Sequence, residues 1–120
     1  KLPARRRSCT HKAVIGEERL TIYLGVGLKE DSTPGEVWFE AAKVGTFVKG
    51  IIGALARSAS LLLQYNAPLE EVCKSWLGLN FPPQGEVKTD HGSILWCDSV
   101  VDWAAKELMH WYGRERGTRV

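Results

Sequence analysis

The sequence predicts an α+β protein: a small antiparallel β-sheet, made of an N-terminal hairpin plus one further strand, packed against three α-helices. Two observations predict this class. In residues 9–41 apolar residues alternate with other residues, which is the two-residue period of a strand with one buried face. In residues 44–112 the apolar residues recur at helical spacing instead. A run of strands followed by a run of helices is typical of the α+β class.

The clearest strand signal covers residues 20–28, and residues 36–40 alternate in the same way. The segment between them, 29–35, is rich in the turn-forming residues Asp, Ser, Pro and Gly, so the two strands should form an antiparallel hairpin. Residues 9–15 add a possible third strand that ends at Gly16. The apolar side chains expected on the buried face of the hairpin are Leu20, Ile22, Leu24, Val26, Leu28, Val37 and Phe39.

Three helices should follow. Residues 46–65 carry apolar residues over most of the helix circumference, which predicts the central core helix. Pro68 fits the first turn of a short second helix. Residues 78–92 are predicted to be a loop, and a last helix should begin at residue 92 or 93 and end at 112, capped by Gly113. One stripe of the first helix is not apolar, and it consists of Lys49, Gly53, Arg57, Ser60 and Gln64. Its small residues and its arginine would permit close approach by another backbone, a subunit or a ligand.

The chain of 120 residues is expected to form a single domain, because 44% hydrophobic and 25% charged residues are ordinary globular composition and no linker is visible. Residues 1–8 are a basic lead-in and residues 113–120 a basic tail. The net charge is only +2, so these basic ends flank an acidic middle. Such a distribution suits a phosphate-bearing ligand or a neighbouring subunit. The alternative is that both ends are solubilising tails.

The three cysteines, Cys9, Cys73 and Cys97, are widely spaced and form no CxxC pair, which argues for a reducing compartment. No set of close ligands predicts a zinc site, and no cofactor is expected. The longest apolar stretch is broken by polar residues and is predicted to be too short to span a bilayer. Without a visible signal peptide, we expect a cytoplasmic protein that does not bind a membrane. The first residue is lysine rather than methionine, which indicates processing, trimming or a fragment.

The loop of residues 81–91 is the best candidate for a ligand site. An aromatic ring on a proline-stiffened backbone can stack on a base, and a polar group can bond a base edge or a ribose hydroxyl. The end of the loop is also predicted to lie at a helix N-terminus, which offers free N–H groups to anions. The alternative is that Phe81 simply fills the core. The candidate residues of this loop are Phe81, Pro83, Gly85, Thr89, Asp90 and His91.

A second set of candidates lies on the last helix and beyond it. Lys106 and His110 are four residues apart and share a face, and Arg114 follows them, so the three form a basic strip suited to phosphate. The alternative is that Lys106 forms an ordinary helix ion pair with Asp102 on a solvated face.

Arg57 is the most distinctive single residue, because a charge on an otherwise apolar helix needs a partner or a ligand. The competing interpretation is an ion pair with Glu36 or Glu40. His11 is expected to be a structural histidine with satisfied hydrogen bonds. No hydrolase motif, P-loop or dinucleotide fingerprint is present, so the chain is not expected to be an enzyme.

Four segments carry a resemblance to a known family: RRRSCTHKAVIG, PGEVWFEAAKVG, LLLQYNAPLEEV and NFPPQG. In this order and at these spacings they resemble the small C-terminal region of adenosylcobalamin-dependent ribonucleotide reductases, over about residues 1–113. The catalytic cysteines, the radical-bearing segment and the cobalamin-binding barrel of that family have no counterpart here. The resemblance therefore implies a nucleotide-related module without reductase activity of its own.

As a stand-alone chain, the sequence also resembles the phage Thoeris anti-defence proteins of the first type. That resemblance implies a homo-oligomer, a dimer or larger, which holds a cyclic ADP-ribose-type signal between subunits. Phe81 and Asp90 or His91 of one subunit would then face Lys106 and His110 of another, although arginines are expected where this chain has those two residues. Because of this departure, Arg57 and Arg114 are also expected to bind the phosphates.

Three hypotheses follow. The leading one is a non-enzymatic protein of the bacterial host cytoplasm that sequesters a cyclic or phosphorylated adenine nucleotide and so counteracts antiphage defence. The alternative is an auxiliary C-terminal module of an adenosylcobalamin-dependent ribonucleotide reductase that binds the catalytic subunit or an effector nucleotide. Nucleic-acid binding through the basic ends is the weakest hypothesis, because the body of the chain is acidic.

Overall fold

The computed structural model describes residue 2 and residues 5–113, which form an antiparallel sheet with helices packed against it. The five strands are β1 (Ser8–Ile15), β2 (Leu20–Leu28), β3 (Pro34–Glu40), β4 (Gly85–Lys88) and β5 (Trp96–Cys97), and their order in the sheet is β3-β2-β1-β4-β5. The helices are α1 (Thr46–Gln64), α2 (Leu69–Lys74) and α3 (Val100–Tyr112). The predicted α+β class is confirmed.

The predicted strands of the first third are confirmed. β1 and β2 pair in register from Ser8 opposite Gly27 to Ile15 opposite Leu20, and Gly16 enters the connecting turn with a positive φ of 76°. Alternate side chains of β2 are buried, with Ile22, Leu24 and Val26 fully inaccessible, as the two-residue period requires.

On the other face of β2, a glycine is required by its neighbour on β3. A Cβ atom at Gly25 would lie 2.0 Å from the indole of Trp38, so this ring can lie across the strand only because the side chain is missing.

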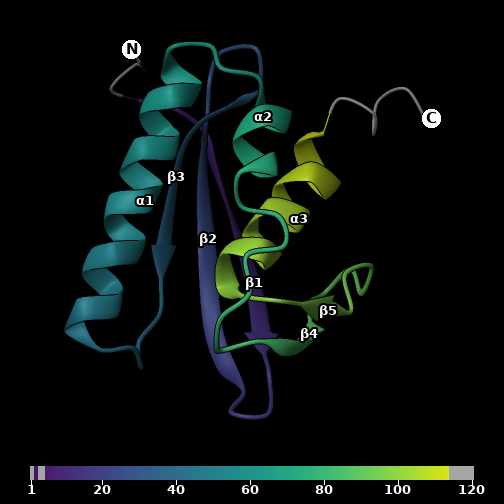
Figure 1. Ribbon diagram of the computed structural model, residues 1–120. Helices are drawn as coiled ribbons and strands as arrows, with labels where there is room; N and C mark the ends of the chain where they lie inside the picture. The colour runs from purple at the N-terminus through teal and green to yellow at the C-terminus, as the bar shows by residue number, and fades with distance from the viewer. Residues whose placement is uncertain (1, 3–4, 114–120) are drawn as a thin grey trace.

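The core helix is α3 rather than α1, which corrects the prediction for residues 46–65. Eight residues of α3 are buried, and the list includes Trp103, Ala104, Ala105 and Leu108. In Figure 1 α1 runs alongside β3, at the edge of the sheet. It buries only Ala56, Ala59, Ser60 and Leu63.

The contact between α1 and β3 is partly polar. The Ser60 hydroxyl accepts a hydrogen bond from the Val37 N–H (2.9 Å) and donates one to the Val37 carbonyl (3.1 Å). Gln64 donates to the Gly35 carbonyl at 3.2 Å. Two of the five residues in the stripe predicted for contact with another subunit or a ligand, Ser60 and Gln64, are therefore bonded to the protein's own edge strand.

The region between α2 and α3 holds two strands that the sequence did not predict. β4 lies inside the expected loop, and β5 lies inside the segment expected to begin the last helix. α3 begins later, after Ser99, whose hydroxyl accepts a hydrogen bond from the Asp102 N–H at 3.0 Å and caps the helix. Strands of four and two residues are too short to show a period, which is why the pattern did not reveal them.

Pro68 is the N-cap of α2 rather than a first-turn residue.

Candidate functional site

The loop that was expected to bind a base borders an acidic cleft. Pro83 and Gly85, together with the exposed Trp96, line a cavity of about 830 Å³. Its lining also includes Glu17, Glu18 and Glu86 but no lysine or arginine among the described residues. Negative charge on the walls of a cleft repels phosphate, so this cavity suits an apolar or cationic group better than an anion.

The remaining loop candidates are held by local hydrogen bonds. Phe81 is 42% exposed rather than fully buried, and its N–H donates to the Asp98 carbonyl at 3.0 Å. The Thr89 hydroxyl accepts from the Gly92 N–H at 3.1 Å, and Asp90 is exposed. Because α3 begins only at residue 100, neither Thr89 nor Asp90 lies at a helix N-terminus. The anion site expected there is not formed.

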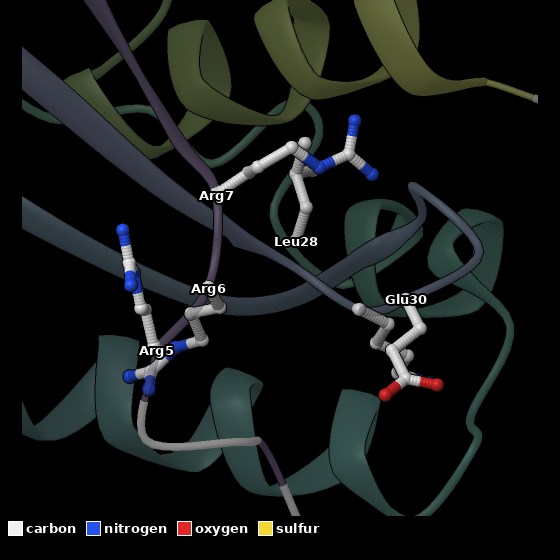
Figure 2. Close-up of a pocket in the computed structure, with 6 residues that line it drawn as sticks. Arg5, Arg6, Arg7, Leu28 and Glu30 are labelled. Carbon is white, nitrogen blue, oxygen red and sulfur yellow. The ribbon is translucent and has the colours of Figure 1, made fainter.

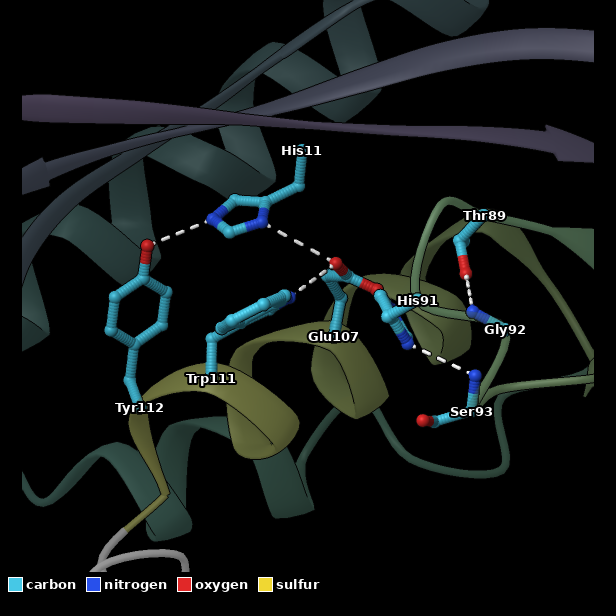
Figure 3. Close-up of polar contacts among 8 residues, drawn as sticks. All are labelled: His11, Thr89, His91, Gly92, Ser93, Glu107, Trp111 and Tyr112. Carbon is cyan, nitrogen blue, oxygen red and sulfur yellow. Dashed lines mark hydrogen bonds and ion pairs between the residues drawn. The ribbon is translucent and has the colours of Figure 1, made fainter.

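The most connected polar group is the buried carboxylate of Glu107 on α3, which is 2% exposed. It contacts His91 Nε2 at 2.9 Å, His11 Nδ1 at 3.3 Å and the Trp111 indole N–H at 2.9 Å. The other nitrogen of His11 lies 2.8 Å from the Tyr112 hydroxyl. Figure 3 shows these side chains converging on Glu107 from β1, from the loop of residues 89–93 and from α3 itself. We call these five residues the Glu107 cluster.

The electrostatics of the Glu107 cluster favour an ionised carboxylate. Burial alone would raise the pKa of Glu107, but hydrogen bonds from His11, His91 and Trp111 outweigh burial and hold that pKa below its usual value. Burial, aided by the neighbouring Cys9 thiol, raises the pKa of Tyr112. The predicted role of His11 as a structural histidine agrees with this geometry, because both of its ring nitrogens have partners.

Two of the predicted candidates, His91 and His110, meet within one subunit. Their rings stack with centroids 4.3 Å apart and planes inclined by 14°. The contact ties the loop of residues 89–93 to the end of α3, whereas the anti-defence resemblance assigned these residues to different subunits. Arg114, the third member of the predicted basic strip, lies outside the described residues.

Lys106 forms the helix ion pair that was the alternative interpretation. Its Nζ lies 2.9 Å from Asp102 Oδ2 and donates to the Trp96 carbonyl at 3.1 Å. Asp102 is not solvated, however, because it is 1% exposed and also accepts from the backbone N–H groups of Gly78 and Asp98 at 2.8 Å. Lys106 thus balances the charge of a buried carboxylate.

Arg57 is exposed, so the argument that burial forces it to have a partner does not hold. It lines a cleft of about 980 Å³ between α1 and β3 together with Glu36 and Trp38. Within the described residues no ion pair of Arg57 is found, and Glu36 instead pairs with Arg6. Glu40, the other expected partner, is exposed at the end of β3.

A cationic cleft at the start of the chain was not among the predicted site residues. Arg5, Arg6, Arg7, Leu28, Lys29 and Glu30 line a cavity of about 520 Å³. We call it the arginine cleft. In Figure 2 Arg7 extends away from Arg5 and Arg6, and the carboxylate of Glu30 is turned away from the three guanidinium groups.

The arginine cleft is fixed by backbone and side-chain contacts. The Leu28 N–H donates to the Arg7 carbonyl at 2.9 Å, and the Arg7 guanidinium donates to the Ser32 hydroxyl at 2.5 Å. A Cβ at Gly27 would lie 2.9 Å from Glu36 Oε1, so this glycine leaves room for the ion pair of Arg6. The run of three arginines was the available sequence signal, and it had been interpreted as a basic lead-in suited to a phosphate-bearing ligand or a neighbouring subunit, but its residues were not named as a site.

The cysteines and possible metal ligands give no catalytic arrangement in the described part of the chain. Cys73 and Cys97 are buried, and burial raises the pKa of Cys73 to about 12, as expected for inert thiols. No group of three or more His, Cys, Asp or Glu residues that is able to hold a metal ion occurs among residues 5–113.

Comparison with known proteins identifies the family. Residues 1–112 match the TSCPD domain. The chain belongs to the TSCPD domain family. Its relatives include the vitamin B12-dependent ribonucleotide reductases of Rhodopirellula baltica, 37% identical over 109 residues, and of Bradyrhizobium diazoefficiens, 34% identical over 108 residues. Each match covers 90% of this chain but only 10% and 8% of the relative, respectively, so this TSCPD chain spans a tenth or less of their length.

The reductase of Agrobacterium fabrum is similar in the same way, with 33% identity over 108 residues, 90% of this chain and 8% of the relative. The resemblance to the C-terminal reductase region is thus confirmed, whereas the comparisons give no support to the Thoeris anti-defence resemblance. No solved structure matches the chain.

Proposed function

We propose that this TSCPD chain is an auxiliary, non-catalytic module of a vitamin B12-dependent ribonucleotide reductase and that it binds a nucleoside triphosphate effector. The family match over residues 1–112 supports the first part, because the matched region is a tenth or less of reductases whose remaining length has room for the catalytic machinery. The signal-sequestering hypothesis is not proposed, since the comparisons support its alternative better.

Cobalamin itself does not fit the described residues. An imidazole could supply an axial ligand to a corrin cobalt, but His11 and His91 both face the Glu107 carboxylate, and His110 stacks on His91. We therefore place cobalamin binding and the reductive chemistry in the rest of the reductase, and assign this module a binding role.

The arginine cleft is the observation that carries the nucleotide proposal. Arg5, Arg6 and Arg7 are consecutive and exposed, and Lys29 adds a fourth cation to the same cavity, in which Arg6 is already paired with Glu36. Guanidinium groups bind phosphate through paired, charge-assisted hydrogen bonds. Because the side chains spread along the cleft rather than meeting at one point, they suit the several phosphates of a triphosphate better than a single phosphate.

Calorimetric titration of the 120-residue chain with dATP, ATP and inorganic tripolyphosphate tests this proposal. The double variant Arg5→Ala/Arg7→Ala should bind dATP at least tenfold more weakly, and its remaining affinity should depend less steeply on salt. Lys74→Ala is the matched control, because Lys74 is an exposed cation on α2, away from the cleft.

Equal affinity for tripolyphosphate and dATP would reduce the proposal to polyanion binding. Unchanged dATP affinity in the double variant would overturn the cleft assignment. If no nucleotide binds but a reductase catalytic region co-purifies with the chain, the module instead docks on that region.

A further inference from the structure

The outward face of α1 is apolar although nothing in the described chain covers it. Six large apolar residues on or next to this helix are between 42% and 80% exposed: Phe47, Val48, Ile51, Leu61, Leu62 and Tyr65. By length and composition α1 is apolar enough to cross a membrane, which corrects the expectation that the apolar stretch in this region is too short, although core helices of soluble proteins pass the same test. Only 22% of its most apolar window is buried, however, so α1 is not a core helix. An exposed apolar face of this size is typical of an interaction site.

Exposed residues along one line of α1 are arranged in a heptad pattern. Starting at Phe47, alternating steps of four and three residues lead to exposed positions only, and this is the spacing of a coiled-coil seam. The seam consists of Phe47, Ile51, Ala54, Ser58, Leu61 and Tyr65, all of them exposed. It lies directly opposite the buried face, because Ala56, Ala59 and Leu63 occupy the other side of the helix.

The residue types of the seam are arranged symmetrically about Ala56. An aromatic residue stands at each end, a branched aliphatic residue lies inside each aromatic one, and a small residue lies on each side of the centre. If a second α1 packs antiparallel, Phe47 meets Tyr65 of the second copy, Ile51 meets Leu61, and Ala54 meets Ser58. Large residues then face large ones at both ends, and the small residues let the helices approach at the centre.

We propose that the outward seam of α1 binds a second copy of this chain, as an antiparallel, two-fold symmetric helix pair. A two-fold contact uses the same patch on both copies, and a seam whose residues mirror each other about one point meets this requirement. One flank of the seam, Val48, Leu55 and Leu62, is apolar as well, and it adds to the buried area.

The seam is large enough for a specific interface between two copies. The exposed fractions of these side chains leave on the order of 600 Å² per copy to bury, which is about 1,200 Å² for the pair and the lower end of stable specific interfaces. We expect a reversible dimer that dissociates in the micromolar range.

Arg57 gives the pair a distinctive salt dependence. It lies on the other flank of the seam, one residue from the centre at Ala56, so the two copies of Arg57 lie near the two-fold axis and repel each other. Salt screens this repulsion and strengthens apolar contact, so association should tighten as salt rises. An acidic partner protein would show the opposite dependence.

Sedimentation equilibrium of the 120-residue chain from about 1 to 500 µM tests the pair. Ile51→Glu and Leu61→Lys should each weaken association at least tenfold, and the two changes in one chain should restore it. Antiparallel packing places each introduced carboxylate opposite an introduced ammonium group, whereas parallel packing would place like charges together. Arg57→Gln should strengthen the dimer. The matched control is Leu95→Glu, since Leu95 is 69% exposed but lies beside β5.

Circular dichroism first confirms that each variant is folded, and its association is measured afterwards. A monomer throughout the concentration range would overturn the proposal. So would a double variant that remains monomeric, because it would contradict the antiparallel register. Binding of the wild-type chain to lipid vesicles in place of self-association would assign the seam to a membrane instead. The test is independent of nucleotide binding, because no substitution in it touches the arginine cleft.

Discussion

Of the two long helices of this TSCPD chain, the more polar one is also the more buried one. α1 carries only Lys49 and Arg57 as charged residues in 19 positions and buries four residues, whereas α3 carries Asp102, Lys106 and Glu107 in 13 positions and buries eight. The difference shows that apolar composition does not by itself place a helix inside. α3 can be the core helix because each of its carboxylates has several donors within the fold. The apolar face of α1 has no partner among the described residues.

The largest expected effect comes from the apolar centre of α3. Trp103 is fully buried, and its indole N–H has no hydrogen-bond partner, so the residue contributes through packing alone. Trp103→Ala should lower the free energy of unfolding by roughly 3–5 kcal/mol, because it leaves a large cavity. Urea denaturation followed by circular dichroism measures this loss. A decrease below about 1 kcal/mol would show that α3 is not the core helix.

The second effect concerns the polar side of α3. Glu107→Ala removes the acceptor of three donors, from His11, His91 and Trp111, and the side chains of His11 and His91 are only 11% and 13% exposed. We expect a loss of roughly 2–4 kcal/mol in the free energy of unfolding. Trp111→Phe removes only one of these donors and serves as the matched, milder variant. If Glu107→Ala were neutral, the burial of α3 would not depend on its hydrogen-bonded carboxylate.

The third effect is a loss of stability in acid. Burial raises the pKa of Asp102, but hydrogen bonds from Gly78 and Asp98 and the contact with Lys106 outweigh it, so the pKa of Asp102, like that of Glu107, is lower in the folded state. A lowered folded pKa contributes stability that is present above the unfolded values, 3.8 and 4.5, and that is lost as the pH falls through the folded values.

Unfolding free energies measured between pH 7 and pH 3 should therefore decline most steeply below about pH 4.5. The decline should be shallower in Glu107→Gln, which cannot titrate at that position. An equal decline in this variant would assign the acid sensitivity to other groups.

The smallest expected effect lies on α1. Phe47→Ser and Leu61→Ser change side chains that are 80% and 57% exposed, so in dilute, monomeric solution each should alter the free energy of unfolding by no more than about 0.5 kcal/mol. Losses comparable with that of Trp103→Ala would mean that the outward face of α1 is covered within a single chain.

The sequence predicted those parts of the fold whose pattern is long enough to repeat. The nine residues of β2 and the 19 of α1 show their periods clearly, and their bounds were close to those observed. β4 and β5 were missed because two to four residues have no measurable period. The position of α1 was wrong because periodicity reports which face is apolar, but not whether the chain itself supplies a cover for it.

The same reasoning applies to the site. His91 and His110 were singled out and do lie together, but Glu107, which His91 contacts, was not. A signal was present, since Glu107 interrupts the apolar face formed by Trp103, Ala104 and Leu108. Its partner His11 is far away in sequence, however, and no local pattern brings such residues together.

The bond between His11 and Tyr112 joins residues 101 positions apart, nearly the full length of the domain. Its consequence concerns the order of assembly. Of the described elements β1 is synthesised first, yet the imidazole of His11 is bonded only after the last helix has been made. The contact is therefore highly non-local, and non-local contacts slow folding. The domain should therefore fold slowly, because the β1–β2 hairpin can complete its contacts only when α3 docks on it. A chain that stops short of Tyr112 would leave the histidine of its first strand without this partner.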